Sequence, residues 1–195
     1  CIPLCAPVEY PEAALPIHPY VLGAWLGDGT SRCSAITFHE DDRFIVDKCV
    51  AIEGGNCGKW QRNSGKPHIY CVSVGTGRNS LTKRLRIAGL LQNKHIPEIY
   101  LTASVAQRRE LLAGLLDTDG TVGKKGRVEF SVVSKVLAEG TLELIRSLGF
   151  KASMTEGRAK ISGVDKGPPY RINFTPSVPV FSLPRKLESQ NDGPS

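Results

Sequence analysis

Residues 18–30 read HPYVLGAWLGDGT, and residues 109–121 read RELLAGLLDTDGT. The two stretches align without gaps, and each is an apolar run that closes on Asp-Gly-Thr. Small residues stand four apart in both copies, Gly23 with Gly27 and Gly114 with Thr118. Because an α-helix has about 3.6 residues per turn, this spacing puts the small residues on one face, where two helix backbones can approach closely. The repeat therefore predicts two short helices, each with a face of small residues that another helix backbone can approach.

Each predicted helix ends at an aspartate, Asp28 or Asp119. Gly29 and Gly120 follow, and both are expected to form left-handed C-caps. A carboxylate at a helix C-terminus lies beside unsatisfied carbonyl oxygens and the negative end of the macrodipole, which is unfavourable unless a cation is present. One such aspartate would indicate only a helix ending. The duplication instead predicts a cation site shared by the two.

The segments that follow the two helices also correspond. Short runs with interleaved polar residues predict strands at 34–38, 58–62 and 68–74, then at 128–133, 151–156, 159–164 and 170–174. Amphipathic helices are expected at 42–52 and 135–148, and each half closes on an apolar, basic segment, 81–91 and 180–187. The predicted fold class is α/β (α+β), with a tandem αββαββα repeat of elements.

The predicted organisation is an N-terminal tail at 1–16, a first half at 17–101, a second half at 102–187 and a C-terminal tail at 188–195. With 41% hydrophobic residues in 195, the two halves can share a core. No apolar run approaches the roughly 18 residues of a membrane helix, and no secretory signal is evident, so a cytoplasmic (intracellular) protein is expected. The single methionine, Met154, leads us to expect a processed product or an excerpt of a longer protein.

The formal net charge of +6 favours a polyanionic partner, although a merely solvated basic surface has the same composition. All six cysteines lie at or before Cys71 and form no C-x-x-C pair, so reduced thiols in a reducing compartment are predicted. A zinc site made by Cys49, Cys57, His68 and Cys71 is the less favoured alternative, because the spacing matches no standard module.

The stretches VLGAWLGDG (21–29) and LAGLLDTDG (112–120) resemble the two signature motifs of LAGLIDADG homing endonucleases, especially those encoded within inteins. The second matches seven of nine consensus letters, and the resemblance covers about residues 16–187. It implies a pseudo-two-fold repeat in which the two motif helices pack against each other at the interface, and in which two antiparallel sheets form a DNA-binding saddle.

The same resemblance implies a metal centre. It assigns the metal-binding carboxylates to Asp28 and Asp119, with Mg²⁺ as cofactor and Mn²⁺ as a substitute. Gly27 and Thr118 are expected to add backbone oxygens. At the sixth motif position Leu26 stands opposite Asp117, which implies asymmetric capping and leaves the metal site intact.

Residues 93–97 read NKHIP and resemble the N-K-x-I-P segment of intein endonucleases, whose lysine reaches the catalytic centre. The counterpart in the second half is LPRKL at 183–187, with Lys186 as the expected equivalent of Lys94 and Arg185 as its competitor. A lysine beside a phosphate can stabilise developing negative charge or order the attacking water, whereas most surface lysines do neither. The predicted catalytic residues are therefore Asp28, Asp119, Lys94 and Lys186.

DNA recognition is expected from exposed strand faces in the major groove, with no recognition helix. Base contacts are assigned, by strand alternation, to Lys59, Gln61, Asn63, Arg158, Lys160, Ser162, Arg171 and Asn173, with Arg62 beside them. Phosphate contacts, which position without specifying, are assigned to Arg78, Lys83, Arg84, Lys124, Lys125 and Arg127. For any one of these residues, a solvated sheet face is the alternative.

The implied function is a site-specific homing endonuclease that hydrolyses double-stranded DNA and leaves short 3′ overhangs. Because both motif copies lie in one chain, a monomer acting on a long asymmetric target is expected. The alternative is a nucleic-acid-binding module, a maturase or a regulator, that keeps the fold without cleavage. No Thr-x-x-His block and no terminal His-Asn occur, so protein splicing is not expected, although Cys1 could be a nucleophile. We interpret the chain as the endonuclease part of an intein or a free-standing relative.

Overall fold

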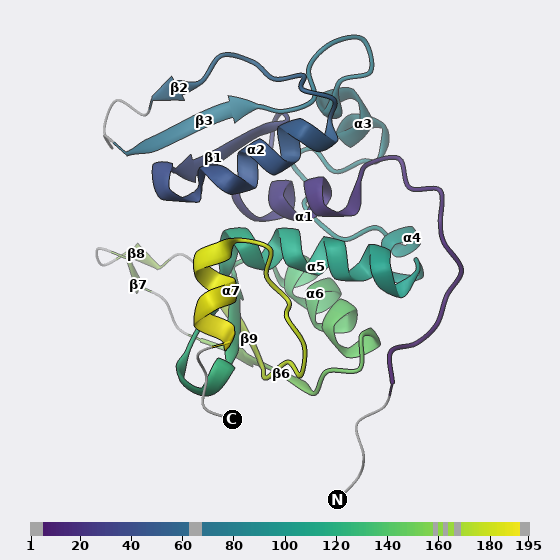
Figure 1. The fold of residues 1–195 in the computed structure, drawn as a ribbon, viewed down its shortest axis with the longest axis vertical. Coiled ribbons are helices and arrows are strands. Elements are labelled where there is room, and N and C mark those ends of the chain that lie inside the picture. Colours follow the sequence, from purple (N-terminus) through teal and green to yellow (C-terminus); the bar gives the residue numbers. More distant parts are fainter. Residues whose placement is uncertain (1–5, 63–67, 158–159, 162–163, 166–168, 192–195) are drawn as a thin grey trace, which may run out of the picture.

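The structure, a computed structural model, describes residues 6–62, 68–157, 160–161, 164–165 and 169–191. Two helix-and-sheet halves lie on either side of a central pair of helices, α1 (Pro19–Asp28) and α5 (Val105–Asp119) (Figure 1). Both central helices end at their aspartates, as the repeat predicts. The proposed contacts Asn63, Arg158 and Ser162 lie outside the described residues.

The starts of the two central helices differ. Helix α1 has Pro19 in its first turn, and the ring nitrogen of His18 accepts a hydrogen bond from the Tyr20 amide at 3.3 Å. Helix α5 begins upstream of the motif, because Ser104 and Gln107 form a capping box that satisfies two free amides. The second motif helix is therefore longer than the repeat alone predicts.

The two helices meet through glycine. A Cβ on Gly23 would overlap the Leu111 carbonyl oxygen and lie 2.9 Å from the Leu115 amide. The contact is reciprocal, since a Cβ on Gly114 would overlap the Tyr20 carbonyl oxygen in the same way. The small-residue face predicted from the sequence is thus the place where the two backbones touch.

The first half has a three-stranded antiparallel sheet in the order β1-β3-β2, made by β1 (Ala35–His39), β3 (Ile69–Ser73) and β2 (Gln61–Arg62). A 3-10 turn η1 (Glu40–Asp42) leads into α2 (Arg43–Ile52), and α3 (Leu81–Ile87) follows the sheet. The strand predicted at 58–62 is paired only over its last two residues.

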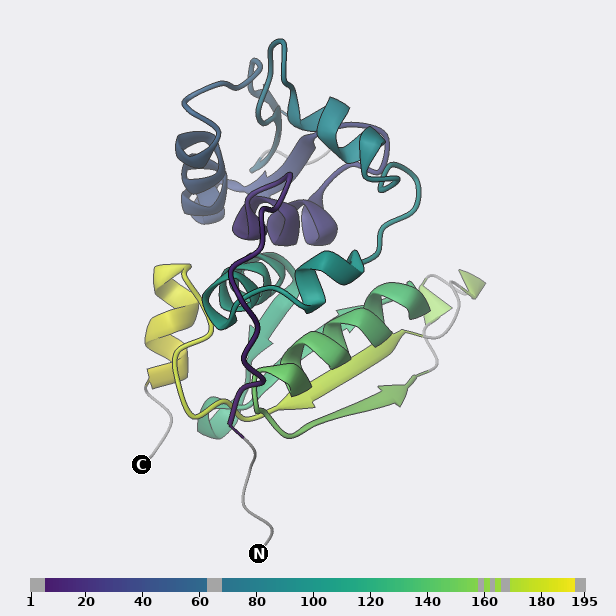
Figure 2. The same cartoon turned by 90° about the vertical axis from the view of Figure 1, so that its right-hand side faces the viewer.

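The second half has a four-stranded antiparallel sheet in the order β4-β5-β9-β6. Its strands are β4 (Gly120–Val122), β5 (Val128–Val132), β9 (Tyr170–Phe174) and β6 (Ala152–Glu156), and η2 (Lys124–Gly126) lies between β4 and β5. Helix α6 (Lys135–Ser147) covers one face of this sheet (Figure 2), and α7 (Pro184–Asn191) closes the half.

The predicted αββαββα order holds more fully in the second half than in the first. Where β4 pairs with β5, the first half has only an isolated bridge between Gly29 and Ile36. The strand predicted at 159–164 is replaced by β7 (Lys160–Ile161) and β8 (Val164–Asp165), which pair with each other outside the main sheet. A short helix that was not predicted, α4 (Glu98–Leu101), joins the halves.

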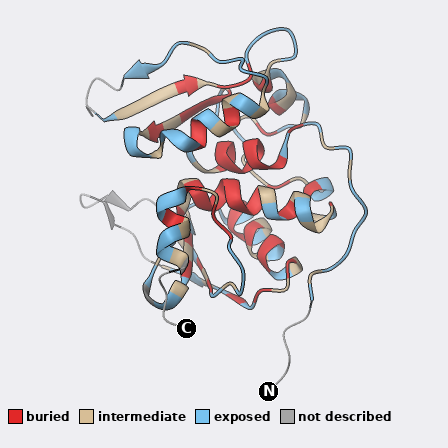
Figure 3. Cartoon of the chain, in the orientation of Figure 1, coloured by how far each residue is buried: buried red, intermediate tan, exposed pale blue. Residues whose placement is uncertain are grey.

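The buried residues gather along α1 and α5 and on the elements that face them (Figure 3). No helix in the described part of the chain is long and apolar enough to cross a lipid bilayer.

Both predicted tails are wrong in part. The N-terminal segment crosses α5 (Figure 2), and the Val8 amide donates to the Ser147 carbonyl at 2.9 Å. The Gln107 side chain binds both backbone groups of Ala13, and the fully buried Arg108 donates to the Val8 carbonyl. These side chains supply polar partners that composition does not reveal. At the other end, α7 continues to Asn191, so residues 188–191 are helical.

Candidate functional site

The site lies where the C-terminal ends of α1 and α5 meet, next to α7 (Figure 1). A Cβ on Gly27 would lie 3.1 Å from a carboxylate oxygen of Asp119 and would overlap the Thr118 side chain. The second aspartate is therefore held against the end of the first motif helix. Asp28 follows Gly27 and is exposed, whereas Asp119 is half-buried. The structure thus brings together the two carboxylates assigned to metal.

The glycines after these aspartates do not form the left-handed caps that we predicted. Gly29 has φ −73° and ψ 146°, and Gly120 has φ −81° and ψ 145°, so both are extended. Glycine is required for another reason: a Cβ on Gly29 would overlap the Trp25 carbonyl, and one on Gly120 would lie 2.6 Å from the Leu116 carbonyl. The chain leaves each helix straight into sheet pairing.

A lysine caps each helix end. The Lys94 amine donates to the carbonyl oxygens of Leu26 and Gly27, both at 2.9 Å, and lies 5.1 Å from the centre of the Trp25 ring. These are orphan carbonyls of the last helical turn, which have no partner within the helix. The cation also opposes the negative end of the helix dipole.

Lys186 does the same at α5. Its amine donates to the carbonyl oxygens of Leu116 at 2.9 Å, Asp117 at 2.7 Å and Thr118 at 3.1 Å, and the residue is only 7% exposed. The structure places Lys186, and not Arg185, in the position equivalent to Lys94.

Arg185 makes a different contact. Its guanidinium forms two hydrogen bonds, at 2.7 and 2.8 Å, with the carboxylate of Asp42 in the first half. Arg185 therefore links the two halves beside the site.

The charges of the site perturb one another. Partial desolvation and then repulsion by Asp28 raise the pKa of Asp119 to about 6, against the attraction of both lysines. Desolvation also raises the pKa of Asp28. It lowers the pKa of Lys94 to about 8 and lowers that of Lys186. Two carboxylates that resist ionising together are a place where a cation would be stabilising.

The donors present fit a hard divalent cation. Mg²⁺ prefers oxygen ligands from carboxylates, carbonyls, water and phosphate, which this helix end supplies. The carbonyl oxygens of Gly27 and Thr118, predicted as further ligands, accept the lysine hydrogen bonds. Each carbonyl oxygen has two lone pairs, so that contact does not prevent coordination. A cavity of about 510 Å³ opens beside Asp119 and Lys186.

A buried carboxylate behind the site was not assigned a role from the sequence beyond asymmetric capping. Asp117 is fully buried and accepts hydrogen bonds from the Tyr20 hydroxyl at 2.7 Å and from the amides of Ser182 at 2.9 Å and Leu183 at 3.0 Å. In the first half the equivalent residue is the buried, apolar Leu26. The difference in residue type at the sixth motif position was the available signal.

No three His, Cys, Asp or Glu side chains gather as a metal site within the described residues, so the zinc alternative has no support there. Cys49 is buried in the apolar core, whereas Cys57 is exposed.

In the second half the outward sheet face carries the residues assigned to base contacts on β9. Ile172 and Phe174 point into the core, so the exposed Arg171 and the half-buried Asn173 point outward. The Arg127 guanidinium donates to the Asn173 side-chain oxygen at 3.1 Å, and Lys125 is exposed in η2. The side chains of Lys124 and Lys160 lie outside the described residues.

In the first half the pairing separates two neighbouring predictions. Gln61 pairs with Cys71, whereas Arg62 pairs with Tyr70, so the two side chains leave opposite faces of the sheet. Arg62 shares its face with the aromatic residues Tyr70 and Phe38. Gln61 and the exposed Lys59 remain on the other side.

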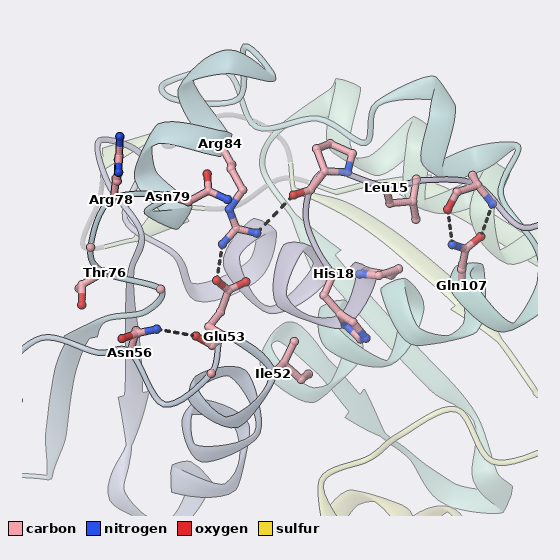
Figure 4. A pocket seen from close by; sticks show the side chains of 16 residues that line it. Leu15, His18, Ile52, Glu53, Asn56, Thr76, Arg78, Asn79, Arg84 and Gln107 are labelled. Carbon is pink, nitrogen blue, oxygen red and sulfur yellow. Dashed lines mark hydrogen bonds and ion pairs between the residues drawn. The ribbon is translucent and has the colours of Figure 1, made fainter.

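Three residues assigned to phosphate lie away from the aspartates. Arg78 and Arg84 line a cavity of about 770 Å³ together with His18, at the N-terminal end of α1 (Figure 4). A helix of 10 residues is about 15 Å long, so this cavity lies at the opposite end from Asp28. Arg84 is ion-paired with Glu53 and also donates to the Pro16 carbonyl at 3.3 Å. Lys83 is exposed on the adjacent α3.

The chain has relatives of known family. Residues 95–191 match the family described as homing endonuclease. The chain is 38% identical, over 92% of its length, to a replicative DNA helicase DnaB of Mycobacterium intracellulare, and 34% identical, over 72%, to the homothallic switching endonuclease of Saccharomyces cerevisiae. It spans only 27% and 28% of the length of these two relatives.

A solved structure has the same fold. Mesophilic variants of the homing endonuclease I-DmoI superpose with a TM-score of 0.52 and 16% identity, over 89% of this chain and 94% of that one. The paired helices and the two antiparallel sheets agree with the fold that these matches indicate. The chain belongs to the LAGLIDADG homing endonuclease family.

Proposed function

We propose that this chain is a site-specific endonuclease that hydrolyses double-stranded DNA with divalent metal ions. The observation that carries the proposal is the meeting of Asp28 and Asp119 at paired helix ends, each end capped by its own lysine, Lys94 or Lys186. Loss of an acid would favour a binding module without cleavage. All four groups are present, so cleavage is the better supported function.

The protein groups have distinct tasks in this proposal. Asp28 and Asp119 would hold Mg²⁺, or Mn²⁺ in its place, with the carbonyls of Gly27 and Thr118 as further oxygen donors. When bound, such an ion would supply Lewis-acid chemistry for phosphodiester hydrolysis. The lysine ammonium groups add positive charge for a phosphate at the helix ends.

DNA is proposed to lie along the outward sheet faces. Gln61, Lys59, Arg171 and Asn173 read base edges, while Lys125 and Arg127 contact phosphates. Arg158, Lys160 and Lys124 are proposed to join them. Structures of I-DmoI in complex with its target DNA, in the presence of Mn or Mg, support this use of the fold. If these contacts form, log affinity will fall linearly with log salt concentration.

The proposed enzyme is a monomer with a long asymmetric target, because α1 and α5 already form the two-fold interface within one chain. Sedimentation showing an obligate dimer would contradict this. Because the chain matches about a quarter of a helicase, we propose that it is an intein or a similar inserted element. An intracellular, reducing location is part of the same proposal.

The decisive experiment incubates the protein with DNA that carries the uninterrupted insertion site, in Mg²⁺, in Mn²⁺ or in chelator. We expect one double-strand cut, only with metal, and mapping of the ends should show short 3′ overhangs. A shuffled DNA of equal length is the control. Tight, specific binding without a cut in either metal would instead identify a nucleic-acid-binding module.

A further inference from the structure

Asp117 precedes Asp119 by two residues and is fully buried, and the hydrogen bonds of its carboxylate go to other segments of the chain. One carboxylate oxygen accepts from the backbone amides of Ser182 and Leu183, and the other accepts from the Tyr20 hydroxyl. The two amides stand immediately before α7, where a helix has free amides to satisfy. Tyr20 belongs to the first half. Asp117 therefore joins the start of α7 to a residue of the opposite motif helix.

The same two segments are joined a second time in reverse. Lys186, in the first turn of α7, donates to the carbonyls of residues 116–118 in α5. The side chain from α5 thus holds the backbone at the start of α7, and the side chain from α7 holds the backbone at the end of α5. The hydrogen bonds of Asp117 and those of Lys186 support each other, because both hold the start of α7 close to the end of α5.

Among its described residues, the first half has no such arrangement. Its sixth motif residue is Leu26, which cannot accept a hydrogen bond, and Lys94 comes from the loop at 93–97. If Asp117 served only to fill the core, an apolar residue would serve as well, as it does at Leu26. An ionisable group is costly to bury unless it is hydrogen-bonded, so the hydrogen bonds of Asp117 offset a cost that Leu26 does not have.

We propose that Asp117, oriented by Tyr20, is a positioning residue that keeps the Lys186 amine at the C-terminal end of α5. The inference rests on the proposed function for its effect on cleavage, but the placement itself needs neither metal nor DNA. The first half thereby acts, through the Tyr20 hydroxyl, on the lysine of the second half. Lys94 has no corresponding dependence.

The first test measures how readily acetic anhydride labels each lysine in the metal-free protein. In Asp117→Leu, which copies the first motif, we expect labelling of Lys186 to rise about tenfold while labelling of Lys94 stays unchanged, because the lost hydrogen bonds no longer hold α7 and its lysine against the end of α5. Asp117→Asn should behave like the wild type, since its carbonyl oxygen still accepts two amides and its NH₂ can donate to Tyr20. Unchanged labelling of Lys186 in folded Asp117→Leu, or an equal rise at Lys94, would overturn the proposal.

A milder pair of variants covers the case in which Asp117→Leu does not fold. Tyr20→Phe removes only the hydroxyl, and we expect about a threefold rise in labelling of Lys186. Tyr100→Phe is the matched control, because the buried Tyr100 hydroxyl binds the backbone of Ile17, away from the site. Labelling of Lys186 in Tyr100→Phe should stay at the wild-type level. Equal labelling in the two variants would refute the role of Tyr20.

The second test uses DNA labelled on one strand at a time. Asp117→Leu should slow by at least about tenfold the same nick that Lys186→Ala slows, and should leave the other nick near normal. Added to Lys186→Ala, it should cause no further loss, because a residue that acts only through Lys186 is silent without it. Equal slowing of both nicks, or a further loss in the double variant, would show a merely structural role. A protein that cuts no DNA would refute the proposed function, and the labelling would still decide the placement.

Discussion

The two halves place the same chemistry in different surroundings. Each half gives one aspartate and one lysine to the ends of the paired helices. Lys94 lies on a loop, whereas Lys186 lies on α7, whose start is held by hydrogen bonds to Asp117. The duplicated sequence therefore specifies the helix ends and their charges, while each half has its own way of holding the lysine. Equivalent positions in a pseudo-two-fold site need not be equivalent in energy.

The aspartates differ as well. Asp119 is half-buried and close to the first motif helix, so burial and then Asp28 raise its pKa to about 6. Asp28, in the same site, is exposed. We expect the carboxylate of the second half to depend more on a bound cation than that of the first.

The largest effect should come from Asp119→Asn or Asp28→Asn. Either change removes a negative charge from the proposed metal site, so cutting should fall by at least about a thousandfold. Metal-free DNA affinity should be equal or higher, because one negative charge beside the polyanion is gone. Cleavage rate and metal-free DNA affinity are measured on the same preparation. Circular dichroism checks that each variant is folded.

The outcome also tests whether the aspartates merely end their helices. In that case Asn, which suits a helix end, should leave both cutting and binding close to normal. A fully active Asp119→Asn protein would therefore refute the metal site, and a folded variant that no longer binds DNA would show that the site is misplaced.

The next largest effect concerns the interface shared by the halves. Gly23→Ala and Gly114→Ala should each lower the free energy of unfolding by about 3 kcal/mol, because each new Cβ would overlap a backbone oxygen of the other helix. Gly140→Ala in α6 is the control, since the new Cβ would lie 3.4 Å from the Ile96 side chain and overlap no backbone atom. Alanine is also a better helix former than glycine. Urea unfolding measures all three. Unequal losses at the two motif glycines would break the symmetry of the interface.

Much of this molecule could be predicted from the repeat. The helix ends at Asp28 and Asp119 and the close approach at Gly23 and Gly114 follow from periodicity, because spacing and residue size alone determine them. The extended backbone at Gly29 and Gly120 could not be predicted. A glycine that is needed because a side chain would not fit looks the same in sequence as one that is needed for a left-handed conformation.

The contacts of polar side chains over long separations were harder to predict. The link from Tyr20 through Asp117 to residues 182–183 joins segments that periodicity treats as independent. Arg84 was assigned to DNA as a basic residue, but its position beside Glu53 makes it part of an ion pair. The charge of a basic residue does not show whether its side chain is paired inside the fold or exposed to solvent.

A smaller effect should appear in the pH dependence of metal-free stability. Because the pKa of Asp119 is raised to about 6 in the folded state, the unfolded chain ionises first as pH rises from 4. Folded-state stability should therefore fall, by on the order of 2 kcal/mol, between pH 4 and pH 6 and then level off. In Asp119→Asn this component is absent, so the variant should gain on the wild type over that range. Thermal melts at matched pH measure the difference, and a constant difference would contradict the raised pKa.

The smallest effect should come from the ion pair that ties α7 to the first half. The side chains of Arg185 and Asp42 are 55% and 20% exposed, so solvent screens the pair, and Asp42→Asn should lower stability by only about 0.5 kcal/mol. The bidentate geometry still fixes the orientation of the Arg185 guanidinium, because two parallel hydrogen bonds allow little rotation.

The same pair can be tested by lysine labelling. If the pair helps to hold α7 in place, Asp42→Asn should slightly increase acetylation of Lys186 and leave Lys94 unchanged. Arg43→Gln, which removes an exposed helix-surface pair with Asp47 nearby, is the matched control and should alter neither lysine. A larger rise at Lys94 than at Lys186 would mean that the pair supports the first half instead, and would reverse the comparison between the two lysines.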